Sequence, residues 1–197
     1  MKSKKFLTFF FIVINLASVN YSYSIEPDVF VQSTVNRASA ALNNKYSKEE
    51  KIEKLKQIAS ETVDIRGIGF YTLGAYRKSI SESEKKEYEI LFEKYFLKSF
   101  ASRLAEYSNP EIEVISKKKL NDNYTMVSSK LVPTEQRPEV KIDWRIYTKK
   151  PQNPLIRDLI IEGLSLARTQ KEEFSSIIQS NDGDINALFD TLRNFIK

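Results

Sequence analysis

The segment from Val140 to Phe174 constrains the fold of this chain more than any other. From Val140 to Tyr147 the side chains alternate strictly, and one face carries Val140, Ile142, Trp144 and Ile146. This period of two predicts a strand with one buried and one solvated face. Residues 149–154 contain two prolines, which fix the backbone and favour a turn.

The residues after this turn complete a strand–strand–helix unit. Leu155 to Glu162 is a second, largely apolar segment, and Gly163 ends it. Leu164 to Phe174 is predicted to turn into a helix, with Ser165 bonding free backbone groups at the corner. The unit is therefore a hairpin followed by a helix.

The amino-acid composition restricts the kinds of catalytic and metal sites that the chain can form. The chain has 197 residues, a length that favours one compact domain, and it contains no His and no Cys. Imidazole-based triads, cysteine nucleophiles and most transition-metal sites are thereby excluded, so we expect no metal and no cofactor. Carboxylate, Lys, Tyr or Ser chemistry remains open.

The first residues have the pattern of an export signal. Lys2, Lys4 and Lys5 precede an apolar run from Phe6 to Ala17, and small residues surround a cleavage point near Ser24. The run is shorter than the roughly 20 residues of a spanning helix. We predict a signal peptide over residues 1–24, a single domain over 25–197 and an exported protein.

Cleavage would also change the net charge. Without three of the 31 basic residues, 28 remain against 26 acidic ones, and the net charge falls from +5 to +2. Nucleic acid is therefore not an expected partner. The lysines at 117–119 and 149–150 fall in predicted turns, where they are either simply solvated or a small patch for anionic lipid or an acidic partner.

Helical patterns dominate both ends of the mature chain. Apolar residues follow Pro27 at helical spacing up to residue 42. Ser47 and Ser81 each begin a capping box, and a final apolar stripe follows residues 182–184. The helix after Ser81 is predicted to run to about Tyr107. The glycine-rich segment 64–77 lacks the spacing of a phosphate-binding loop, and we interpret it as a short helical segment whose glycines allow close packing.

Two more strands, Glu111–Val114 and Tyr124–Leu131, precede the central hairpin. Four strands joined by short polar turns predict an antiparallel meander. The predicted fold is an α+β domain in which a curved four-stranded antiparallel sheet is wrapped by several helices.

The sequence also resembles a known family. The stretch Val140-Lys-Ile-Asp-Trp-Arg145, the signature Asp158-Leu-Ile-Ile-Glu-Gly-Leu-Ser165 and Glu173-Phe174 are similar to the MlaC/toluene-tolerance family of periplasmic phospholipid-binding proteins. Upstream, Asp64, Leu73-Gly74, Phe92 and Tyr107 fit the same pattern, so the resemblance covers roughly residues 27–196. Pro154 stands where the family often has an aromatic residue, and Lys171 replaces a frequent Arg.

The resemblance implies a carrier whose cargo is phospholipid. Such a carrier would shuttle lipid between an outer-membrane lipoprotein/porin complex and an inner-membrane ABC transporter complex with a lipid-binding ring, which maintains outer-membrane lipid asymmetry. It also implies an apolar lipid pocket between sheet and helices. We place the acyl chains against Leu73, Tyr76, Phe92, Phe96, Phe100, Ile142, Trp144, Ile146 and Ile160. Aromatic residues on the long helix either fill the core or line that pocket.

Two other functions stay open. Asp158 and Glu162 are four residues apart on one predicted strand, and Asp158 or Asp143 could act with a Tyr in a small enzyme on a cone-shaped α+β scaffold. We expect instead that Arg145 or Arg157 keeps Asp158 and Glu162 ionised in a structural role. The second alternative is a non-enzymatic protein-interaction module of the cell envelope.

Overall fold

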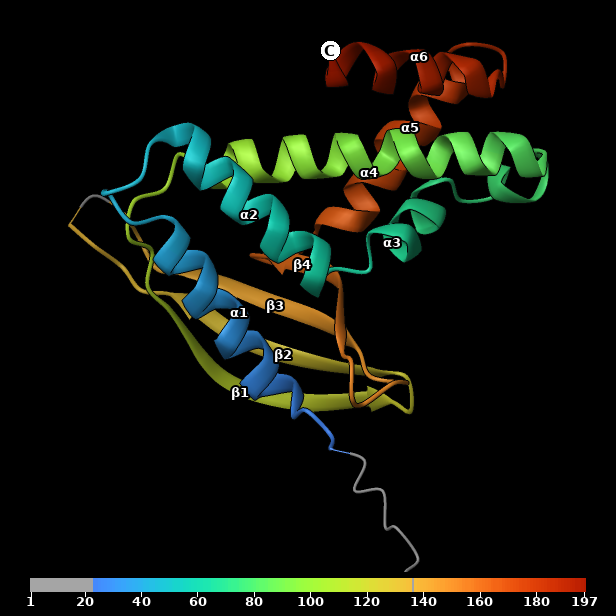
Figure 1. Ribbon diagram of the computed structural model, residues 1–197. Coiled ribbons are helices and arrows are strands. Elements are labelled where there is room, and N and C mark those ends of the chain that lie inside the picture. The colour runs from blue at the N-terminus through green and yellow to red at the C-terminus, as the bar shows by residue number, and fades with distance from the viewer. Residues whose placement is uncertain (1–22, 136) are drawn as a thin grey trace, which may run out of the picture.

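The computed structural model describes residues 23–135 and 137–197. The predicted signal peptide falls almost entirely on residues 1–22, which lie outside the described part of the chain. In the described ranges no helix is both long and apolar enough to cross a membrane. Figure 1 shows the overall arrangement, in which a twisted sheet lies beneath a group of helices.

The sheet is an antiparallel meander in chain order. Its strands are β1 (Ile112–Asn121), β2 (Tyr124–Leu131), β3 (Val140–Tyr147), β4 (Leu155–Ile161) and β5 (Leu164–Ser165). The α+β class is confirmed, and the sheet has one short strand more than the four predicted. β5 was missed because it is only two residues long and follows a two-residue turn, Glu162–Gly163, in which both φ angles are positive.

A β-bulge in β4 changes which side chains face inward. Arg145 pairs with Asp158 and Ile146 with Ile156, so Arg157 is an extra residue in the ladder. Beyond it the alternation is shifted by one position, and Trp144 lies opposite Leu159. Glu162 lies outside the strand, in an exposed turn, so it does not share a strand face with Asp158 as predicted.

β1 is longer than its apolar pattern indicated. The predicted strand ended at Val114, whereas hydrogen bonding to β2 continues to Asn121. Lys117–Lys119 are therefore strand residues, and their expected place in a turn was wrong. Residues 116–121 are all exposed, so neither face of this part of the strand carries an apolar signal. Lys117 pairs with Glu26 and Asp28, whereas Lys149 and Lys150 do lie in the β3–β4 turn region.

The helices begin largely where the capping residues predicted. They are α1 (Pro27–Ala41), α2 (Lys48–Thr62), α3 (Ile65–Thr72), the 3₁₀ turn η1 (Tyr76–Lys78), α4 (Glu82–Leu104), α5 (Leu166–Gln179) and α6 (Ile185–Ile196). Both capping boxes form: Ser47 with Glu50 begins α2, and Ser81 with Glu84 begins α4. α4 ends three residues before the predicted Tyr107.

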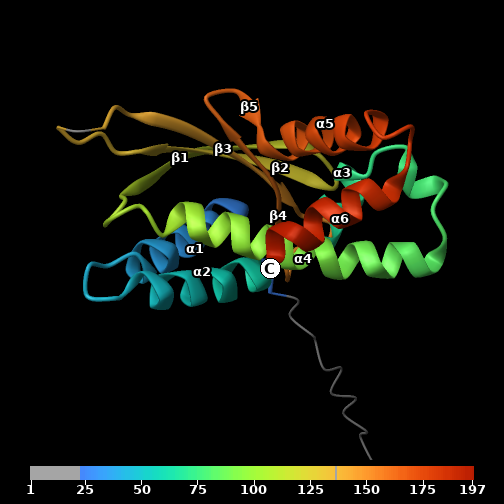
Figure 2. The ribbon, with the colours of Figure 1, turned by 90° about the horizontal axis from the view of Figure 1, so that it is seen from above.

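The helices form layers on the sheet. α1 packs on β1 and β2, while α3 and α5 pack on β4. The long helix α4 contacts α2, α3 and α6; Figure 1 shows it above the sheet, and Figure 2 shows the same arrangement from above. The main core includes Val127, Trp144 and Ile146 from the sheet and Tyr88, Phe92, Phe174 and Phe189 from the helices.

Candidate lipid-binding site

A cavity of about 590 Å³ lies between the helices and the sheet. It is lined by α1, α2, α4 and α5 on one side and by β3 and β4 on the other. Most of the lining is apolar, and the polar residues include several exposed ones at the rim. A partly open, apolar cavity of this size suits a ligand with hydrocarbon chains.

Five of the nine residues to which the sequence analysis assigned acyl-chain contact line this cavity. They are Phe92, Phe96, Phe100, Ile142 and Trp144. The other four lie outside the lining. Leu73 and Ile146 are fully buried in the core, and Tyr76 packs against the core from η1. Ile160 pairs with Asp143, so it lies on the opposite face of the sheet from Trp144 and Leu159. We therefore leave these four out of the candidate site.

Phe92, Phe96 and Phe100 form one wall because they recur every four residues along α4. The ring centroids of Phe92 and Phe96 are 6.2 Å apart, and those of Phe96 and Phe100 are 5.5 Å apart with an interplanar angle of 9°. The ring centroid of Phe174 of α5 lies 6.2 Å from that of Phe92, and the two rings are perpendicular. This packing holds the rings as a rigid apolar surface.

Trp144 provides the opposite wall from β3. Its indole Nε1–H donates to the Ser129 hydroxyl at 2.8 Å, and that hydroxyl in turn donates to the Ile142 carbonyl at 3.1 Å. The only polar atom of the indole side chain is thus satisfied inside the sheet, which leaves the ring to present hydrocarbon. Trp144 is 8% exposed.

Sequence reasoning missed the lining residues on β4, α1 and α2. Leu159 and Ile161 replace Ile160 because of the bulge at Arg157, which has no signature in the apolar pattern. The cavity is also lined by Val35, Ala38 and Leu42 at helical spacing in and directly after α1, and by Leu55, Ile58 and Ala59 on one face of α2. These apolar stripes were visible in the sequence, but helical spacing alone does not distinguish a residue that lines a cavity from one that fills the core.

Asp158 is a buried charged residue in the cavity lining. Its side chain is 2% exposed, and its two oxygens accept hydrogen bonds from the Ser165 hydroxyl at 2.6 Å and from the Ala167 N–H at 3.0 Å. Arg145 lies 3.8 Å away, and Arg157 pairs with Asp64 instead. The carboxylate is thus bound to the start of α5, as expected for a structural residue.

Polar side chains of α4 and α5 meet at one part of the rim. The Tyr95 hydroxyl donates to the Gln170 side chain at 2.9 Å, and Gln170 donates to Glu173 at 2.9 Å. Burial raises the pKa of Tyr95, and the nearby Glu173 carboxylate raises it further. Tyr95 is therefore a neutral hydrogen-bond donor.

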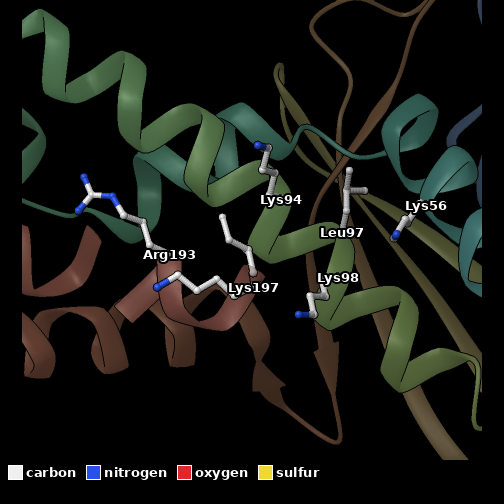
Figure 3. A pocket seen from close by; sticks show the side chains of 7 residues that line it. Lys56, Lys94, Leu97, Lys98, Arg193 and Lys197 are labelled. Atoms are coloured by element: carbon white, nitrogen blue, oxygen red, sulfur yellow. The ribbon is translucent and has the colours of Figure 1, made fainter. Parts of the chain in front are cut away.

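A second hollow, of about 560 Å³, lies on the opposite face of α4 (Figure 3). Four lysines and one arginine surround two aliphatic side chains there: Lys56, Lys94, Lys98, Lys197, Arg193, Leu97 and Ile196. Several of these cations are already engaged, since Arg193 pairs with Glu87 and Asp190 and Lys56 with Glu53. This cation-rich surface does not provide the dry walls that a hydrocarbon chain needs.

Within the described ranges, no group of three or more carboxylate, imidazole or thiol side chains is placed to hold a metal ion. Fold and cavity together define the class: an α+β domain that encloses an apolar ligand site between a meander sheet and its covering helices. The model of the MlaC protein family matches residues 32–194. This match spans most of the chain, and the protein belongs to the MlaC family.

A solved structure has the same fold. It is the phospholipid-binding protein from Ralstonia solanacearum in complex with a phospholipid, which superimposes with a TM-score of 0.73. The match covers 87% of this chain and 97% of that one, at 18% sequence identity. At such low identity the similarity establishes the fold that the two chains share.

Proposed function

We propose that this protein is a periplasmic carrier that binds the acyl chains of a phospholipid in the cavity between α4 and β3. The observation that carries the proposal is the cavity itself, whose walls are the stacked rings of Phe96 and Phe100 and the indole of Trp144. Membership of the MlaC family and the phospholipid bound by the Ralstonia solanacearum protein support this choice of ligand.

Physical chemistry explains why such a cavity is sufficient. Each CH₂ removed from water gains about 0.8 kcal/mol, but a bilayer already provides that gain. A carrier therefore needs only walls about as dry as the bilayer, with the headgroup left in water. Rigid aromatic rings meet this need because they expose hydrocarbon without having to rearrange. No reacting group is required.

Transport between the two membranes is the further part of the proposal. A carrier of this kind would receive lipid from, or deliver it to, an outer-membrane lipoprotein/porin complex and an inner-membrane ABC transporter complex. We further propose that residues 1–24 are removed on export. The structural engagement of Asp158 by Ser165 and Ala167 favours a carrier over an enzyme that uses this carboxylate.

A vesicle assay tests the proposed activity. Donor vesicles contain a fluorescent phospholipid at self-quenching density, and acceptor vesicles contain none. We expect the protein to accelerate transfer in proportion to its concentration. A rate no faster than the spontaneous rate, measured with folded protein that was shown to bind the same lipid, would contradict transport while leaving binding intact.

A further inference from the structure

Two arginines line the otherwise largely apolar cavity, and neither has a carboxylate partner among the residues that the structure describes. Arg103 lies in the last turn of α4, and Arg137 lies in the connection between β2 and β3. Both segments lie at the same end of the molecule in Figures 1 and 2. Tyr107 also lines the cavity there, and the Arg137 guanidinium lies 6.0 Å from the centroid of its ring.

Arg137 has an unsatisfied donor. Its Nε is shielded from solvent and has no hydrogen-bond partner in the described chain, while its Nη2 reaches the Val132 carbonyl only at 3.5 Å. A shielded guanidinium N–H without an acceptor is unfavourable, and native structures rarely leave one. An acceptor supplied by a bound ligand would remove this cost.

Arg103 is exposed at the rim, and among the described residues no carboxylate lies within ion-pair distance of it. Its position at the end of α4 also suits the helix dipole, so its presence alone does not require a ligand. The acidic residues of the lining do not neutralise either arginine. Asp158 is engaged by Ser165 and Ala167, and Glu173 accepts from Gln170.

We propose that Arg103 and Arg137 bind the phosphate group of the carried lipid, and thereby select phosphorylated lipids over neutral lipids with the same acyl chains. This inference rests on the proposed function, because acyl chains in the cavity would leave the glycerol and phosphate at the rim. Guanidinium groups suit this role, since their fork of N–H donors matches phosphate oxygens and they stay charged at all physiological pH values.

Equilibrium binding of two fluorescent lipids tests the assignment. The first is a phosphatidylglycerol, and the second is a diacylglycerol with the same acyl chains but no phosphate. Arg103→Gln with Arg137→Gln is the test variant, and Arg77→Gln, which removes one exposed arginine of η1 away from the cavity lining, is the control. Inorganic phosphate is added as a competitor to separate a lipid headgroup from free phosphate.

We expect the unmodified protein and Arg77→Gln to bind phosphatidylglycerol about tenfold more tightly than diacylglycerol, which corresponds to one or two charge-assisted hydrogen bonds. The double variant should lose this preference and keep its diacylglycerol affinity. Replacing both arginines by Lys should retain part of the preference, since the charge is kept and the fork is lost. Millimolar inorganic phosphate should not displace the lipid.

Three results would overturn the assignment while leaving the proposed carrier function standing. The first is an unchanged preference in the double variant, and the second is an equal loss of both lipids, which would make the arginines packing residues. The third is displacement by inorganic phosphate at micromolar concentration, which would indicate a site for free phosphate. If the unmodified protein bound neither lipid, the proposed function itself would fail, and this assignment with it.

Discussion

The Oδ2 atom of Asp158 accepts a hydrogen bond of 2.6 Å from the hydroxyl of Ser165. The same hydroxyl accepts from the Arg168 N–H at 3.1 Å, so Ser165 caps α5 while bound to β4. The second Asp158 oxygen accepts from the Ala167 N–H. This arrangement fixes the first turn of α5, and with it one wall of the cavity, to the sheet.

Replacing Asp158 with Ala should therefore destabilise the fold. The buried Ala167 N–H would lose its acceptor and the Ser165 hydroxyl its partner, at a cost of about 3 kcal/mol in the free energy of unfolding. Urea denaturation followed by circular dichroism measures this. Asp143→Ala is the matched control, because that carboxylate is 18% exposed compared with 2% for Asp158 and should cost about 1 kcal/mol or less. Equal losses for the two variants would contradict a structural role specific to Asp158.

Phe96→Asp should abolish lipid binding and leave the helix content intact. The ring lines the cavity between Phe92 and Phe100, and a carboxylate there costs several kcal/mol when hydrocarbon surrounds it. Ile90→Asp on the same helix is the control, since Ile90 is 56% exposed and should tolerate the change. Binding of a fluorescent phospholipid gives the readout. Unchanged binding by the Phe96 variant would remove this residue from the site.

Gly69→Ala should destabilise the protein through Phe92. A Cβ at position 69 would lie 2.8 Å from Phe92 Cδ1, and the Phe92 ring is held in place because it packs against the rings of Tyr88, Phe96 and Phe174. Overpacking of this kind costs about 1–3 kcal/mol, more than Ala gains over Gly in a helix.

A double-mutant cycle checks the cause of that loss. Phe92→Leu leaves more space beside position 69, so the two changes together should cost less than the sum of the single changes. Additive losses in urea denaturation would show that the Gly69 effect does not act through Phe92.

Tyr88 should contribute a stability that is lost at high pH. Burial raises the pKa of Tyr88 well above its ordinary value near 10, and its hydroxyl lies 2.8 Å from that of Thr72. Above pH 10 the unfolded state loses the proton while the folded state keeps it, so the free energy of unfolding falls by up to about 1.4 kcal/mol per pH unit. Below pH 10 this contribution is complete. Tyr88→Phe should reduce the fall in the free energy of unfolding between pH 10 and 11. An identical pH dependence of this free energy for both proteins would contradict the prediction.

The sequence predicted features that depend on local chemistry. The capping boxes at Ser47 and Ser81 set two helix starts, and the alternation from Val140 to Tyr147 set the central strand with its bounds. Each of these features depends on residues that are close together along the chain, so the sequence alone contains the necessary signal.

Features that depend on contacts distant in sequence were not predictable. The bulge at Arg157 moved Ile160 away from the cavity, and Arg157 itself pairs with Asp64, 93 residues earlier in the chain. Leu73 and Phe96 look alike in an apolar pattern, yet one is fully buried in the core and the other lines the cavity. Whether a side chain fills the core or lines the cavity depends on the distance between α4 and the sheet. Packing across the whole domain sets that distance.

The most direct test of phospholipid binding is the lipid content of the purified protein. The protein is exposed to bacterial membranes, purified in folded form and extracted with organic solvent, and the extract is analysed by mass spectrometry and total phosphate. We predict phospholipid in a fixed molar ratio to the protein, and a large reduction for Phe96→Asp treated in the same way. Folded protein whose extract holds no phospholipid would contradict the proposed role as a phospholipid carrier.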